Sequence, residues 1–280
     1  MGWNRSQLVD KDLFVMEFLD KINRDLSFED RISFFYISKN YTIATNEVKE
    51  GNMTLAKHYF DKANSYAAKF EQKSLHLFRL SNNVYYRSYS LFLFKQNEPV
   101  RAKEMIIESM KNNLQIVEYD QDYLFILFDT AQQYLNLSQL FFVLRKPLLA
   151  KRIYIEVINY LISGNTKNLP FLKNLDVLNE SENYKNLRTI LCLETILSFY
   201  TKILDENNLK KEFYLFSHKI TDDLLLKKDS IIGAIILMIK SKINNKDEDI
   251  KYYENYVNLN YQIQYQKYFQ KINTLMTKLN

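Results

Sequence analysis

The chain has 280 residues, of which 47% are hydrophobic, and a formal net charge of +5 from 38 basic and 33 acidic residues. Its 4 glycines and 3 prolines are too few for the turns of an all-β fold, so the composition predicts an all-α protein of long helices joined by short polar turns. Basic and acidic residues are interspersed, which argues against the basic stripe of a nucleic-acid-binding surface. The single cysteine excludes an internal disulfide and is typical of a reducing compartment.

Apolar residues recur at helical spacing through the first 163 residues. A first helix is predicted over about 7–25, and Ser27 opens the next helix with Asp30 three positions later, as in a capping box. Three hairpins follow, with helices expected at 28–50 and 53–71, 75–96 and 99–114, and 119–144 and 147–163. Pro99 and Pro147 fall at the first turn of the second helix in two of them, where the missing N–H costs nothing.

The three hairpins form an internal repeat. A small residue on the first helix is followed twelve positions later by an alanine on the second: Ala44 with Ala56, Ser90 with Ala102, and Ser138 with Ala150. Small side chains on both helices let the two backbones approach closely. A large residue four positions after each alanine fills the space to the next hairpin: Phe60, Ile106 and Tyr154. The pattern predicts a helical solenoid.

Beyond residue 163 the periodicity weakens. The segment 164–185 is rich in asparagine and contains Pro170, so we expect an irregular insertion there. Degenerate hairpins are predicted over 186–248, from helices near 186–206, 209–226 and 229–243. A long C-terminal helix is predicted over 249–280, and its heptad seam consists of Tyr261, Tyr265, Tyr268, Ile272, Leu275 and Leu279. This seam would either join two chains in a homodimer or cap the last hairpin.

The whole chain, 1–280, is thus expected to form a single helical-repeat domain. It would consist of an N-terminal helix at 1–27, three clear hairpins at 28–163, the insertion, the degenerate hairpins and the C-terminal helix. No signal-peptide pattern opens the sequence, and the longest apolar run, Ile231 to Ile239, is about half of a membrane span. We therefore expect a cytoplasmic protein with no membrane and no nucleic-acid partner.

The hairpins resemble tetratricopeptide repeats, in which small residues of the two helices face each other. Aromatic and aliphatic residues precede the small residue where that family has them, at Tyr86 and Tyr89 in the second copy and at Tyr134 and Leu137 in the third. The alanines are 46 and 48 residues apart, against a standard repeat of about 34, which implies longer helices. The resemblance implies a right-handed superhelical solenoid.

The stretch 32–160, with RSYSLFLFKQNEPVRAKEM at its centre, is similar to the sensor domains of bacterial quorum-sensing receptors of the Rap, NprR, PlcR and arbitrium-receptor type. That resemblance implies a cytoplasmic regulatory receptor that closes its solenoid around a short linear peptide. The DNA-reading module of such receptors is not recognisable, because residues 1–50 carry a net negative charge. A shortened receptor, or one whose output is a protein surface, is therefore expected.

If the hairpins are aligned with tetratricopeptide repeats, the first helix of each hairpin faces an inner, concave surface. It would be lined by Tyr41, Thr45, Asn83, Arg87, Gln132, Asn136 and Gln139. Amide side chains carry a donor and an acceptor together, so they can pair with both groups of a peptide bond. An arginine beside them would take a carboxylate bidentately. The alternative is that these side chains are ordinary solvated polar residues.

Motifs that carry catalytic chemistry are sparse. His58, His76 and His218 share no metal-ligand spacing with each other or with Cys192, and no glycine-rich phosphate loop is present. The sequence therefore predicts a protein that is not an enzyme and has no metal or cofactor. Two functions remain: a regulatory protein that binds a short peptide in its concave groove, and a constitutive scaffold or adaptor for a larger protein partner.

Overall fold

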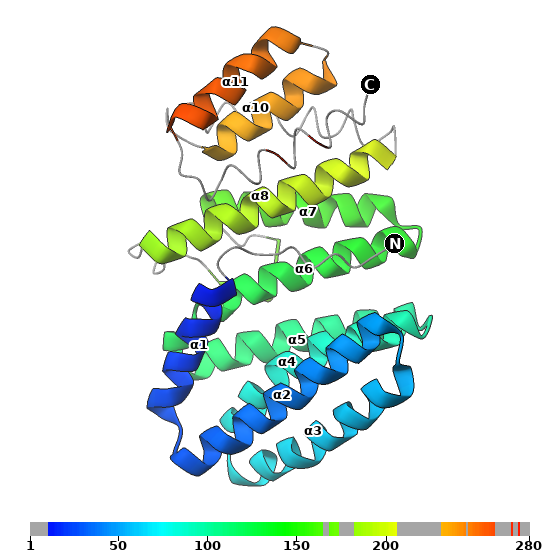
Figure 1. Ribbon diagram of the computed structural model, residues 1–280, viewed down its shortest axis with the longest axis vertical. Helices are drawn as coiled ribbons and strands as arrows, with labels where there is room; N and C mark the ends of the chain where they lie inside the picture. The colour runs from blue at the N-terminus through cyan, green and yellow to red at the C-terminus, as the bar shows by residue number, and fades with distance from the viewer. Residues whose placement is uncertain are drawn as a thin grey trace. The chain divides into compact units, whose positions relative to one another are not determined.

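The computed structural model describes residues 11–164, 168–173, 182–205, 231–244, 246–260, 270 and 274. Throughout this part of the chain the secondary structure is helical, and no strand occurs in it (Figure 1). The predicted all-α class is thus confirmed. Within the same residues, no helix combines the length and apolar character needed to cross a membrane.

The chain divides into two compact units. The N-terminal unit contains residues 10–150 and 165–181, and the C-terminal unit contains residues 1–9, 151–164 and 182–280. The organisation of 1–280 as a single domain stays a prediction.

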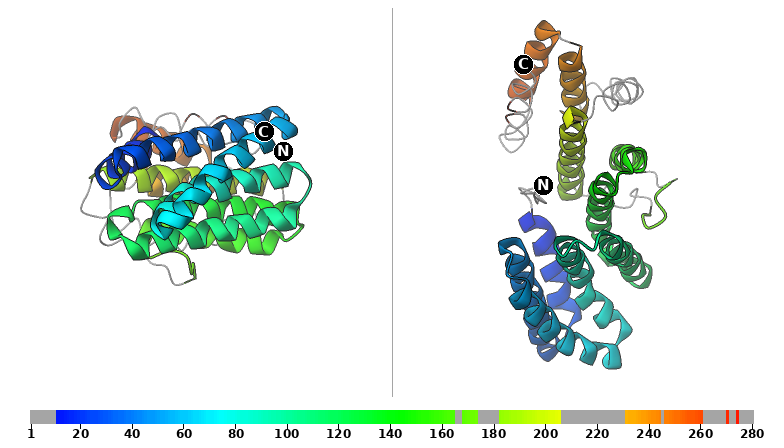
Figure 2. Two further views of the ribbon diagram at one scale, coloured as in Figure 1. Left: turned by 90° about the horizontal axis from the view of Figure 1, so that it is seen from below. Right: turned by 90° about the vertical axis from the view of Figure 1, so that its right-hand side faces the viewer.

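The helices of the N-terminal unit follow the predicted hairpins closely. They are α1 (Lys11–Asp25), α2 (Phe28–Glu50), α3 (Met53–Lys73), α4 (Leu75–Lys95), α5 (Pro99–Tyr119), the 3-10 helix η1 (Gln121–Tyr123), α6 (Ile126–Val143) and the first turn of α7 (Pro147–Ser163). Consecutive helices pack as hairpins, α2 with α3 and α4 with α5, and α4 also packs against both helices of the first hairpin (Figure 2).

The prediction of one helix over 119–144 is wrong at its start. The backbone of Asp120 is extended, and its carboxylate accepts a hydrogen bond of 2.9 Å from the N–H of Asp122. This local bond competes with the α-helix and starts η1 instead, so α6 begins only at Ile126. The preceding helix, α5, continues to Tyr119 rather than ending near 114.

The six small residues that define the repeat are all fully buried. Ala44, Ala56, Ser90, Ala102, Ser138 and Ala150 have no exposed surface. The large residues that follow the alanines are buried as well, with Phe60 at 1% exposure and Ile106 at 0%. The small residues therefore lie in the tightly packed interior, as the repeat predicts.

One turn geometry recurs in all three hairpins. Gly51, Asn97 and Arg145 have positive φ angles of 90°, 63° and 56°. In each turn the next N–H donates to a carbonyl five positions earlier, from Asn52 to Glu47, from Glu98 to Leu93 and from Lys146 to Phe141. These bonds define the Schellman motif that ends a helix. The repeat is therefore present in the backbone as well as in the sequence.

Within the N-terminal unit, a charged cluster holds α1 against the other helices. The ammonium group of Lys21 lies 3.0 Å from Asp25, 3.1 Å from Asp120 and 2.9 Å from Asp122. Although burial opposes the charged form, these hydrogen bonds raise the pKa of Lys21 above its usual value. The hydroxyl of Tyr123 donates to Asp25 at 3.0 Å. The cluster thus links α1 to the segment between α5 and α6.

The C-terminal unit contains the rest of α7 together with α8 (Glu182–Asp205), α10 (Ile231–Ile243) and α11 (Asp247–Asn260). The ring of Tyr154 stacks on Phe199 with centroids 5.2 Å apart, and α10 packs against α8 and α11. The turn from α10 to α11 contains the same hydrogen bond as the hairpin turns, to a carbonyl five positions earlier. The N–H of Lys246 donates to the carbonyl of Ser241 at 2.9 Å. The same hydrogen bond therefore recurs at a fourth helix–helix junction, which the alanine pattern did not reveal.

Several predictions concern the C-terminal half. The insertion predicted over 164–185 is too long, because α8 already begins at Glu182. The predicted helix at 209–226 lies outside the described residues. So does the heptad seam of Tyr261 to Leu279, apart from two helical residues, 270 and 274, that are not members of it. The choice between dimer and cap stays a prediction.

Candidate binding site

The seven residues predicted to line a concave surface lie on α2, α4 and α6, the first helices of the three hairpins. Three of them are buried, with exposures of 0% for Tyr41, 3% for Thr45 and 4% for Asn83. The other four are partly exposed: Arg87, Gln132, Asn136 and Gln139. The set therefore divides into a buried group and a group that a ligand can reach.

Tyr41 and Thr45 take part in the packing of the first hairpin. The hydroxyl of Tyr41 donates to Asn64 on α3 at 2.7 Å, and its ring lies 5.4 Å from that of Tyr85 on α4. Burial raises the pKa of Tyr41 above its usual value, so the hydroxyl keeps its proton and remains a donor. The hydroxyl of Thr45 donates to the carbonyl of Tyr41 at 2.7 Å. Tyr41 thus connects α2 with α3 and α4, whereas the hydroxyl of Thr45 bonds within α2.

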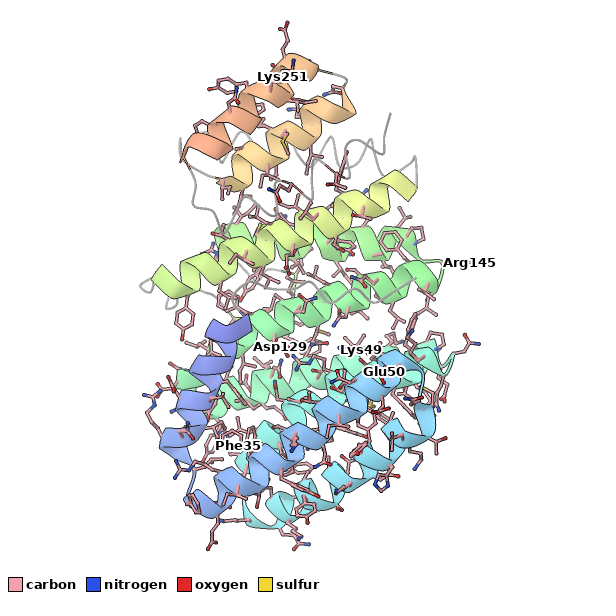
Figure 3. All side chains as sticks on the ribbon, in the orientation of Figure 1. Phe35, Lys49, Glu50, Asp129, Arg145 and Lys251 are labelled. Atoms are coloured by element: carbon pink, nitrogen blue, oxygen red, sulfur yellow. The ribbon has the colours of Figure 1, made fainter. Side chains whose placement is uncertain are left out.

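A buried carboxylate, Asp129 on α6, is the centre of a polar network between α4, α5 and α6 (Figure 3). Its side chain is only 5% exposed. It accepts hydrogen bonds from Nη1 of Arg87 at 2.6 Å and from Nδ2 of Asn113 at 3.0 Å, with a longer contact of 3.4 Å to Nε2 of Gln133. Burying a charge is costly without such partners, and here Arg87 supplies the opposite charge.

Asn113 on α5 extends the network to the second hairpin. Its Oδ1 accepts from Nδ2 of Asn83 at 2.7 Å, and its Nδ2 also approaches the hydroxyl of Thr130 at 3.1 Å. Asn113 has no exposed surface. Asn83 is therefore turned toward α5, where it belongs to the interior network rather than to an open surface.

Two atoms at the edge of this network have no hydrogen-bond partner among the described residues. Nε of Arg87 and Oε1 of Gln132 are both buried, yet neither is paired there. Leaving a buried donor or acceptor unpaired costs about 1–3 kcal/mol. The side chain of Arg87 is 29% exposed, so part of it faces solvent while Asp129 holds Nη1. Arg87 is therefore the member of the network that reaches the surface.

The partly exposed residues of α6 continue from this edge along one helix. Gln132, Asn136 and Gln139 are spaced by four and three positions, which places them on the same side of α6. Nδ2 of Asn136 donates to Oε1 of Gln133 at 3.2 Å, and this bond leaves its own carbonyl oxygen available. Amide groups therefore lie in a row along α6, and the first of them, Gln132, follows Asp129, the partner of Arg87, by three positions.

Four members of this network were not predicted from the sequence: Asn113, Asp129, Thr130 and Gln133. A signal for Asp129 does exist, because an acidic residue stands alone within the strongly apolar stretch YLFILFDTA. A charge in such surroundings is buried and needs a partner. Asn113 gives no comparable signal, since paired asparagines are common in exposed segments.

Other kinds of site find little support in the described part of the chain. No three His, Cys, Asp or Glu side chains gather there in a way that could hold a metal ion. Burial raises the pKa of the Cys192 thiol to about 12, which leaves it protonated and unreactive at neutral pH. A comparison with known proteins found no matching family model, no matching curated protein and no matching solved structure.

Proposed function

We propose that the chain is a tetratricopeptide-like protein, wound as a right-handed solenoid, that binds a short linear peptide against α4 and α6. The observation that carries this proposal is the partly exposed side chain of Arg87, which Asp129 holds at Nη1, together with the partly exposed amides of Gln132, Asn136 and Gln139 on α6. A guanidinium donates to the carbonyl oxygens of a peptide, and an amide side chain can both donate to and accept from a peptide bond.

Asp129 prepares Arg87 for this role. Because the carboxylate holds Nη1 at 2.6 Å, the guanidinium is already oriented before a ligand arrives. A preorganised side chain loses less conformational entropy on binding, which increases affinity. The amides of Asn136 and Gln139 would continue the same backbone contacts along α6, without regard to the peptide's side chains. The likeness to cytoplasmic peptide receptors supports a regulatory role.

A larger protein partner is the second candidate, and a different surface favours it. Phe28, Ile32 and Phe35 on α2 are 68%, 54% and 38% exposed. Their spacing of four and three positions forms an apolar stripe along one side of the helix. Such a stripe is typical of a helix that packs against another protein. The scaffold function would use this stripe and would not need Arg87.

Titration calorimetry with a panel of short synthetic peptides tests the proposal. Peptides that bind are measured again with the Arg87→Lys variant and with Arg101→Lys as the matched control. Arg101 also pairs with a carboxylate, that of Glu98, but at the exposed α4–α5 turn. We expect Arg87→Lys to weaken binding about tenfold or more, because lysine lacks the planar donor edge, and Arg101→Lys to leave it unchanged. Equal effects of the two substitutions, or no binding peptide, would contradict the proposal.

A further inference from the structure

The turn between α6 and α7 carries an apolar and basic surface. Val143, Leu148 and Leu149 are 46%, 74% and 46% exposed, and Arg145 and Lys146 between them are exposed as well. The sequence from 143 to 152 is VLRKPLLAKR, which contains four basic residues and no acidic one. We call residues 143–149 the basic turn. Figure 3 shows Arg145 at its outer end.

The fold does not require this surface. The other two hairpins make the same Schellman turn with different residues in the positions of Leu148 and Leu149, which are Thr54 and Leu55 in the first hairpin and Val100 and Arg101 in the second. Leu55 and Val100 are also exposed, at 43% and 55%, so each of the other turns has one exposed apolar residue at these two positions beside a polar or charged one. The turn between α6 and α7 has two, and it adds Val143 where the other hairpins have Lys49 and Lys95. The folding of the hairpin does not require these additional apolar side chains.

The backbone of Arg145 is a second, independent observation. Its φ of 56° lies in the left-handed region, where the equivalent residues are Gly51 and Asn97. Glycine and asparagine tolerate this region, whereas the Cβ of arginine makes it unfavourable. Strain of this kind is found where a side chain is needed for another purpose. A positive charge at the tip of the turn is thus retained against the local backbone preference.

We infer that the basic turn docks on an anionic lipid surface. Exposed leucines flanked by basic residues suit the boundary between headgroups and acyl chains, since the leucines enter the apolar layer and the cations contact lipid phosphates. Leu148 is 74% exposed at a projecting turn. A rigid protein partner would need a matching pocket for it, whereas a fluid bilayer adapts to its shape. The contact is peripheral and independent of the peptide site at Arg87.

The test is cosedimentation with vesicles, using the full chain. One set of vesicles contains phosphatidylcholine alone and the other contains about one third phosphatidylglycerol. The main variant replaces four residues of the basic turn with those at the equivalent positions of the second hairpin. The substitutions are Arg145→Asn, Lys146→Glu, Leu148→Val and Leu149→Arg. These residues already form the same turn elsewhere in the protein, so the fold is preserved. Circular dichroism checks this directly.

We expect binding to anionic vesicles only, with at least about a tenfold loss of affinity in the turn variant. Leu55→Thr, which changes an exposed leucine at the first turn, is the matched control and should bind like the wild type. Higher salt should weaken binding. Failure to bind anionic vesicles, or equal binding by the turn variant, would overturn the inference. Binding to polyglutamate without binding to vesicles would also overturn it and would assign the turn to an acidic protein.

Discussion

Replacing Asp129 with alanine should lower the free energy of unfolding by roughly 2–2.5 kcal/mol. The bond from Nη1 of Arg87, at 2.6 Å, is charge-assisted, but Arg87 is 29% exposed and can turn toward water, so its loss costs about 1–1.5 kcal/mol. Asn113 is fully buried and loses an acceptor at 3.0 Å, at a cost of about 1 kcal/mol. The 3.4 Å contact from Gln133 is too long to add much.

Urea unfolding followed by circular dichroism measures this change. Asp61→Ala is the control, because Asp61 forms a solvent-exposed pair with Lys57 on α3, and the loss of such a pair should change the free energy of unfolding very little. A double-mutant cycle with Arg87→Met should give a coupling energy of about 1 kcal/mol between Arg87 and Asp129. If Asp129→Ala costs no more than Asp61→Ala, the buried network does not stabilise the helices and the reasoning is refuted.

Four further substitutions test the packing, the charged cluster and the turns. Ala102→Leu should destabilise the protein by roughly 1–3 kcal/mol in thermal unfolding, since Ala102 has no exposed surface; an unchanged melting temperature would mean that space exists there. Lys21→Met should cost about 1–3 kcal/mol at pH 7 in urea unfolding. Burial would raise the pKa of Asp120, but the N–H of Asp122 and the ammonium of Lys21 lower it below its usual value. The ionised carboxylate of Asp120 therefore stabilises the folded protein above about pH 4, and this stabilisation is lost as the pH falls. The difference between Lys21→Met and the wild type should therefore shrink below about pH 4, and a constant difference would contradict the pKa argument. Gly51→Ala should destabilise by about 1 kcal/mol, because only the positive φ opposes an added Cβ, whereas Arg145→Gly should stabilise in the same unfolding assay.

The helices of the first 163 residues were predictable because their signals are local. Pro99 and Pro147 mark helix starts, and Gly51 is a recognised helix-ending residue. The equivalent turn at Arg145 lacks a glycine, so Pro147 and the repeat spacing predicted its position. The split at Asp120 was missed because one side-chain bond outweighed an apolar pattern that continues through it.

The candidate site was only partly predictable. The repeat frame found the helices that carry it, but it could not distinguish a side chain that faces a groove from one that faces a neighbouring helix. Asn83 points to Asn113, whose position depends on the packing of α4 with α5. The pairing of Arg87 with Asp129 joins residues 42 positions apart, which no local pattern reveals. The sequence therefore indicated a polar surface, whereas the structure identifies its buried anchor.

Hydrogen exchange of the full chain, with and without a peptide found by calorimetry, tests the central claim most directly. If the peptide lies against α4 and α6, amides around Arg87 and from Gln132 to Gln139 should exchange more slowly in the complex. The exchange of α3, which contributes no residue to the site, should change little. Protection confined to the apolar stripe of α2, with none on α4 and α6, would contradict the proposed site and favour a scaffold.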